Sequence, residues 1–200
     1  MDFQPTEERR MLVEMIGKFV QNEYPLKGRL DAGASELGYN FQAYAQMADL
    51  GLIGALFDEE IGGFGGAGFD IATVFTELGK GLVNEPLNDT ALASGYILAH
   101  TGHLDWVEQI ISGKKRVALA LIENGADYDW YLPETTAISS GDGWKLTGEK
   151  TSVKFAHGAD AVIVSAKTNT SDGLSLFLVT GNAPGITQHR FQTVDGGSAC

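Results

Sequence analysis

The sequence predicts an α+β protein, in which an all-α helical bundle over residues 1–115 is followed by an antiparallel β-sandwich or barrel over residues 116–200. Two observations support this division. In the first part, apolar residues recur every three to four positions, which is typical of amphipathic helices. After Lys114-Lys115-Arg116 the segments become short, rich in β-branched residues and bounded by Gly, Asp, Asn or Pro, which is typical of strands.

Five stretches of the first part have helical spacing. The first places Leu12, Ile16 and Phe19 on one face, carries acidic residues early, and ends at Pro25, which cannot continue a helix. Glycine closes each of the others, as expected of a C-terminal cap. The short connections indicate a bundle, and the predicted helices are 6–24, 41–51, 69–79, 88–102 and 104–113.

Six stretches of the second part have the length and composition of strands. They follow one another at a spacing of roughly ten residues with turn signals between them, which favours an antiparallel sandwich or barrel. The predicted strand segments are "RVALALI" (116–122), "TTAISS" (135–140), "WKLTGEKTSV" (144–153), "ADAVIVSAK" (159–167), "LSLFLVT" (174–180) and "ITQHRFQTV" (186–194).

Composition and charge narrow the class of protein. With 44% hydrophobic and 20% charged residues the chain is globular, and its net charge of −12 disfavours a nucleic-acid partner. No apolar run is long enough for membrane insertion, and "MDFQPTEERR" lacks a signal layout, so we expect a cytoplasmic protein. The single cysteine, Cys200, excludes an internal disulfide framework, and we expect no metal site.

The densest glycine cluster is "IGGFGGAGFD" (61–70), where Gly63, Gly65 and Gly68 match G-x-G-x-x-G. A dinucleotide loop needs a strand before the glycines and a second parallel strand after the helix, and a helix follows instead. The acidic residues 58–60 would also repel a pyrophosphate. We therefore interpret the cluster as an irregular loop between helices, with a dinucleotide loop as the alternative.

Read as a whole, "LGLIGALFDEEIGGFGGAGFDIATVFTELGKG" (50–81) resembles the N-terminal helical domain of the acyl-CoA dehydrogenase family. Further segments resemble that family in the same order: "WVEQIISGKKRVALAL" (106–121), "TTAISSGDGWKLTGEK" (135–150), "ADAVIVSAKT" (159–168) and "PGIT" (184–187). The resemblance implies lipid catabolism by an oxidoreductase that converts an acyl-CoA thioester to the α,β-enoyl-CoA and passes a hydride to FAD. The implied partners are the acyl-CoA substrate, an electron-transfer acceptor and further subunits of a homo- or hetero-oligomer.

Two family motifs that hold the flavin ring correspond to "LIENGADYD" (121–129) and "KTSVKF" (150–155). By resemblance, the cofactor-binding residues are Leu121, Ile122, Glu123, Ser152, Val153 and Lys154, and the substrate-binding residues are Asp127 and Tyr128. Both motifs depart from the family pattern. Ile122 and Lys154 stand where the family has threonine, and Ser152 stands where tryptophan would pack on the flavin. Lys154 could instead supply a cation for the pyrimidine ring or a phosphate.

The family's catalytic glutamate would lie beyond Cys200, so the catalytic residue is unknown and no base is assigned. The first function that the residues leave open is an FAD-dependent acyl-CoA dehydrogenase. The alternative is a non-catalytic partner subunit of a hetero-oligomeric acyl-CoA dehydrogenase with a degenerate flavin site. The "ELGKGLVNEP" segment (77–86) resembles the branch of the family in which unlike subunits pair. A third, unrelated option is an NAD-binding α/β protein.

Overall fold

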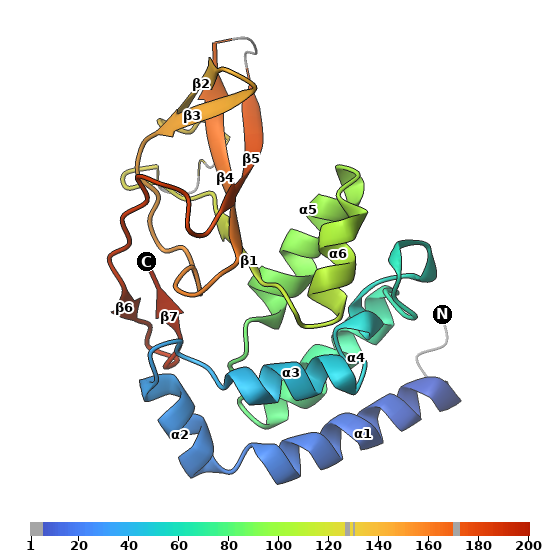
Figure 1. The fold of residues 1–200 in the computed structure, drawn as a ribbon. Coiled ribbons are helices and arrows are strands. Elements are labelled where there is room, and N and C mark those ends of the chain that lie inside the picture. The colour runs from blue at the N-terminus through green and yellow to red at the C-terminus, as the bar shows by residue number, and fades with distance from the viewer. Residues whose placement is uncertain (1–5, 127–128, 130, 170–172) are drawn as a thin grey trace.

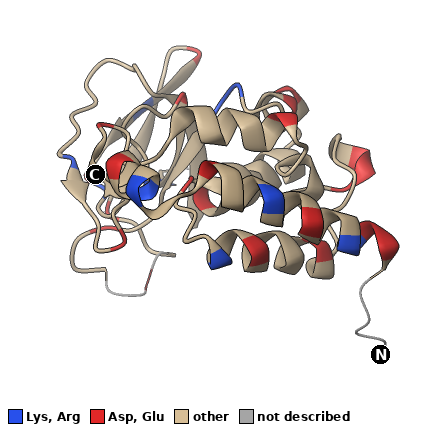
Figure 2. Ribbon diagram, turned by 90° about the horizontal axis from the view of Figure 1, so that it is seen from below, with Lys and Arg blue, Asp and Glu red and all other residues tan. Residues whose placement is uncertain are grey.

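The computed structural model describes residues 6–126, 129, 131–169 and 173–200. Helices make up one part of the molecule and a strongly bent sheet the other, and the segment after the last long strand returns to the helical part (Figure 1). Acidic residues are spread over the helices (Figure 2). Within the described residues, no helix has both the length and the apolar character needed to cross a membrane.

The five predicted helices are confirmed, although the fourth is divided. The helices are α1 (Glu7–Glu23), α2 (Leu26–Ala34), α3 (Phe41–Asp49), α4 (Gly68–Lys80), α5 (Ser94–His100) and α6 (Leu104–Ile111). Short turns of other helix types are η1 (Gly54–Leu56), η2 (Glu59–Ile61) and the π-helical η3 (Asn88–Ala93), which runs directly into α5. Side chains of Thr6 and Asn40 cap α1 and α3 by accepting bonds from backbone N–H groups, as expected of such residues.

Helix α2 was not predicted from the sequence. Its nine residues, LKGRLDAGA, contain two glycines and have no clear apolar face, so its own helix propensity is low. Contacts from distant parts of the chain hold it in place. Arg29 donates hydrogen bonds to the carbonyl oxygens of Leu82 at 3.0 Å and Asp195 at 2.6 Å. Tertiary contacts therefore override a weak local preference.

The second part contains a mixed, open sheet, so the predicted antiparallel sandwich or barrel is wrong in the direction and closure of its strands. Strand β4 (Ala161–Thr168) is at the centre, and β5 (Leu174–Thr180) pairs with it antiparallel. On its other side, β1 (Val117–Ala120) and then β2 (Thr136–Ser140) pair with β4 in parallel, and β3 (Gly143–Thr147) continues from β2 antiparallel. Parallel and antiparallel strands share the same two-residue alternation, so the sequence could not distinguish them.

The last described strands pack beside the helices. Strands β6 (Phe191–Gln192) and β7 (Ser198–Ala199) form a small antiparallel pair. Beyond β7, Cys200 and Val153 exchange two backbone hydrogen bonds, at 2.9 and 3.0 Å. Arg190 donates to the carbonyl oxygen of Ser35 at 2.7 Å, which ties the same segment to the end of α2.

The junction of the two parts is held by Arg116, immediately before β1. Its backbone N–H donates to Asp160 Oδ2 at 2.9 Å, and its guanidinium donates to the same atom at 3.1 Å and to the Tyr39 hydroxyl at 2.7 Å. The guanidinium also lies 5.1 Å from the centre of the Phe41 ring. One side chain therefore links the segment before α3, α3 itself and the start of β4.

The glycine cluster is an irregular loop that folds back on η1. The N–H groups of Gly63, Gly65 and Gly66 donate to carbonyl oxygens of residues 55–58 at 2.8 to 3.0 Å, so these donors cannot cradle a phosphate. A Cβ on Gly63 would lie 2.1 Å from the carbonyl oxygen of Phe57. Close backbone packing therefore explains the glycines, and a 3₁₀ turn rather than a strand precedes them, which excludes the dinucleotide loop.

Candidate functional site

The two predicted motif segments lie side by side. The N–H of Thr151 donates to the carbonyl oxygen of Ile122 at 2.9 Å, although the two residues are far apart in the sequence. Described residues 121–126 and 131–135 lie outside the strands β1 and β2 that they follow and precede, and β2 pairs with β4 beyond β1. Residues 150–155 pass next to the beginning of the segment between β1 and β2.

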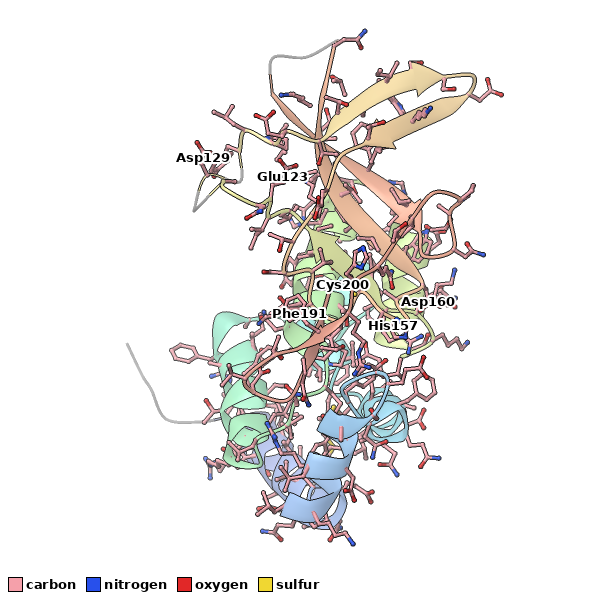
Figure 3. All side chains as sticks on the ribbon, turned by 90° about the vertical axis from the view of Figure 1, so that its left-hand side faces the viewer. Glu123, Asp129, His157, Asp160, Phe191 and Cys200 are labelled. Carbon is pink, nitrogen blue, oxygen red and sulfur yellow. The ribbon has the colours of Figure 1, made fainter. Side chains whose placement is uncertain are left out.

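The carboxylate of Glu123 links the beginning of the segment between β1 and β2 to its end. Figure 3 shows its side chain directed inward, whereas Asp129 lies at the outer side of the loop. One carboxylate oxygen accepts from the Thr135 N–H at 3.0 Å, from the Thr135 hydroxyl at 2.5 Å and from Lys150 Nζ at 2.6 Å. The other accepts from the N–H of Glu134 at 2.5 Å. Lys150 also donates to Ser165 Oγ of β4 at 2.7 Å.

The charges of this network are almost fully buried. The side chains of Glu123 and Lys150 are only 6% and 7% exposed. Desolvation alone would raise the pKa of Glu123, but the hydrogen bonds from Lys150, from Thr135 and from backbone N–H groups outweigh it and lower this pKa to about 2. Glu123 therefore acts as a structural anchor, and its oxygens are already occupied by donors of the chain itself.

The other predicted cofactor residues differ in their surroundings. Leu121, just after β1, is half-buried and Val153 is buried, whereas 46% of Ile122 is exposed. Ser152 is exposed and has a positive φ of 55°, a conformation that L residues rarely adopt. Lys154 Nζ lies 4.0 Å from Asp89 Oδ2 of η3. Asp127 and Tyr128, predicted to bind substrate, lie outside the described residues.

Three backbone donors and three side chains of these segments offer little to a flavin ring. An isoalloxazine needs hydrogen-bond donors aimed at its ring nitrogens and carbonyls, together with a flat surface to lie on. The N–H groups of Thr151, Val153 and Phe155 are used by the carbonyls of Ile122, Cys200 and Ser198. Ile122 is apolar, Ser152 has no ring, and the ammonium of Lys154 faces a carboxylate.

Sequence reasoning missed four residues that shape this region: Asp89, Thr135, Lys150 and Ser165. Their contacts join segments far apart in the chain. Lys150 begins the motif 150–155 but was given no role, and no local pattern marks the other three. Two surface hollows lie elsewhere, one of about 680 Å³ beside His157, Asp160 and Gln188, and one of about 380 Å³ beside Arg190 and Phe191. In the part of the chain that the structure describes, no group of three or more His, Cys, Asp or Glu could hold a metal ion.

The helical bundle, the mixed sheet and the two neighbouring motif segments define a two-part α+β protein. The sequence profile of the acyl-CoA dehydrogenase N-terminal domain matches residues 6–110, and that of the acyl-CoA dehydrogenase middle domain matches residues 118–200. The chain belongs to the acyl-CoA dehydrogenase family.

Similar proteins and solved structures agree with this assignment. The chain is 31% identical to the probable acyl-CoA dehydrogenase YngJ of Bacillus subtilis, over 94% of this chain and 51% of that protein. It is 30% identical to the human mitochondrial short-chain specific acyl-CoA dehydrogenase, over 90% of this chain and 46% of that protein. The structure named "Tcur3481-Tcur3483 steroid ACAD G363A variant" is 28% identical with a TM-score of 0.86, over 96% of this chain and 53% of that chain. The chain thus spans about half the length of the relatives it matches.

Proposed function

We propose that this chain is a cofactor-free member of an acyl-CoA dehydrogenase assembly and works beside a subunit that carries flavin. The reaction of the assembly is the α,β-desaturation of an acyl-CoA thioester with transfer of a hydride to FAD, from which an electron-transfer acceptor takes the electrons. In this arrangement the flavin-bearing subunit supplies the redox chemistry. This chain contributes a folded surface against which the flavin-bearing subunit packs.

One observation carries this proposal: three backbone donors of the 150–155 segment are already used within the chain, and its lysine faces a carboxylate. The N–H groups of Thr151 and Val153 bond to carbonyls of neighbouring segments, and the Lys154 ammonium faces Asp89. The name of the structural relative "Tcur3481-Tcur3483 steroid ACAD G363A variant" joins two components, which supports an assembly of unlike chains.

The second candidate is that this chain binds FAD itself and desaturates acyl-CoA. It is favoured by the contact between Thr151 and Ile122, because the two motif segments lie together as a shared binding site would require. Under this candidate Lys154 is the cation that faces the pyrimidine ring or a phosphate. Electrostatics argues against this candidate. The Asp89 carboxylate, 4.0 Å from Lys154 Nζ, offsets the positive charge that would attract the flavin or its phosphates.

The visible absorption spectrum of the purified chain separates the two candidates. We expect protein without a flavin band, both as purified and after incubation with FAD, and a flavin-containing complex after co-expression with a homologue whose motifs are intact. About one flavin per chain in the protein purified alone would establish the second candidate. Failure to form any complex with such homologues would contradict the first.

A further inference from the structure

Lys154 joins the sheet part of the chain to the helical part. Its Nζ lies 4.0 Å from Asp89 Oδ2, and the two side chains are 53% and 28% exposed. Asp89 belongs to the π-helical turn η3, a type of turn that is rare and recurs at functional sites. The same turn is anchored to β1, because Ser94 Oγ just beyond it donates to the carbonyl oxygen of Val117 at 2.5 Å.

A second carboxylate acts on the same ammonium. Asp195 has its pKa lowered chiefly by hydrogen bonds from the Thr193 hydroxyl and the Gly197 N–H, and the charge of Lys154 lowers it further. Asp195 lies on the turn between β6 and β7, and the backbone bridge between Lys154 and Ala199 brings that turn close. The Lys154 ammonium is therefore attracted by two carboxylates, that of Asp89 in η3 and that of Asp195 in the C-terminal segment.

The geometry points to a role for this pair: the Lys154–Asp89 ion pair excludes a flavin ring from the chain. The inference rests on the proposed function and explains how the chain stays free of cofactor. Lys154 stands where the resemblance places a threonine, and its longer charged side chain fills more space than that hydroxyl would. The Asp89 carboxylate repels a ring that gains negative charge when reduced. A lysine ammonium is strongly hydrated and needs opposite charge around it, and this pair supplies that charge.

The first experiment measures FAD affinity by quenching of flavin fluorescence on the full chain. We expect no measurable binding by the wild type. Lys154→Thr and Asp89→Asn should each raise the affinity by on the order of ten-fold or more above the detection limit. The matched control is Lys145→Thr, because Lys145 is an exposed lysine of β3. It should behave as the wild type.

The second experiment is a double-mutant cycle on urea unfolding with Asp89→Asn, Lys154→Thr and the combined variant. An exposed pair of this kind should change the unfolding equilibrium constant by about two- to five-fold, and this coupling should shrink in 1 M salt. A coupling of zero at low salt would overturn the inference.

The outcomes distinguish the inference from the proposed function. If the wild type binds no FAD and both variants bind no better than Lys145→Thr, the inference is wrong and the cofactor-free role stands. If the wild type binds FAD one to one, both are wrong. If the variants gain binding but the wild type forms no complex with flavin-bearing homologues, the inference stands and the proposed function falls.

Discussion

The hydroxyl of Tyr39 accepts a hydrogen bond of 2.7 Å from Arg116, and this contact fastens the helical bundle to the sheet. Asp160 of the sheet part neutralises the same guanidinium from the other side. Arg116 therefore links the helical part to the sheet part, and the strength of this link depends on its contacts with Tyr39 and Asp160.

Replacing Tyr39 by phenylalanine should weaken this junction. The change deletes one acceptor of a charged donor while Asp160 still pairs with it, so we expect the free energy of unfolding to fall by about 1–2 kcal/mol. Urea unfolding followed by circular dichroism measures it. Tyr96→Phe is the control, because the Tyr96 hydroxyl has only long contacts of 3.4 and 3.5 Å. Equal losses in both variants would contradict a special role for Tyr39.

Glu123→Gln should be strongly destabilising. It leaves the buried ammonium of Lys150 without its counter-charge, and breaking such a pair typically costs about 3–5 kcal/mol. Lys150→Met should cost a similar amount, and the double variant should cost less than the two losses added together. Thermal unfolding of the three variants tests this. Strict additivity would show that the two residues act independently.

The same network predicts acid sensitivity. The folded pKa of Glu123 is about 2, below the ordinary value of 4.5, so the folded state favours the ionised form. The stabilisation is fully present above pH 4.5 and is lost as the pH falls towards 2, by about 3 kcal/mol in total. Unfolding free energies between pH 6 and 2.5 should show this loss for the wild type, and it should be absent in Glu123→Gln.

Glu85 should have the opposite pH dependence. It is buried; one oxygen accepts from the Asn40 N–H at 3.1 Å, and the other has no hydrogen-bond partner within the described residues. Burial raises the pKa of Glu85, and the nearby Tyr24 hydroxyl and backbone N–H groups offset only part of the rise. Stability contributed by the protonated form is lost as pH rises above 4.5.

Glu85→Gln should therefore stabilise the protein at pH 8 and have little effect at pH 4. Glutamine keeps the acceptor for Asn40 and carries no charge. The exposed helix residue Glu108, changed to glutamine, serves as the control and should show no such trend. A benefit of Glu85→Gln that is the same at both pH values would contradict a buried titrating carboxyl.

Gly63→Ala should cost about 2 kcal/mol or more, because the new methyl group would meet the Phe57 carbonyl and the backbone would have to move. Gly68→Ala is the matched control. A Cβ there meets nothing within 4 Å, and Gly68 begins α4, so this change should be neutral or slightly stabilising. Chemical denaturation of the two variants measures the difference, and similar behaviour would refute the packing explanation.

The sequence predicted what local patterns encode and missed what distant contacts create. The spacing of apolar residues and the residues that end helices located α1, α3, α4 and α6, because each of these helices has an apolar face and a clear terminus. Helix α2 has neither and depends on Arg29 reaching Leu82 and Asp195. The positions of β1 to β5 were also visible, but the predicted strand 144–153 ends at Thr147, the predicted strand 186–194 is reduced to Phe191–Gln192, and β7 was not predicted. The parallel pairing of β1 and β2 with β4 was not visible, because no local pattern encodes it.

The motifs located the candidate site, and the cofactor role of its residues stays a prediction. The resemblance placed residues 121–123 and 152–154 together, and the Thr151–Ile122 contact agrees. It assigned Glu123 to the cofactor, whereas both of its oxygens serve Thr135, Glu134 and Lys150. The partner of Lys154 could not be foreseen, because Asp89 lies in another part of the chain and a π-helical turn decides its direction.

The anchoring of the loop after β1 by a single carboxylate has an evolutionary consequence. Glu123 near the start of that loop accepts from the N–H of Glu134 and from Thr135 at its end, and Lys150 joins the same carboxylate to Ser165 of β4. A descendant of this chain that keeps these four side chains keeps the contacts that close the loop, whatever sequence joins its two ends. New specificities can then be tried there while the architecture beneath is inherited unchanged.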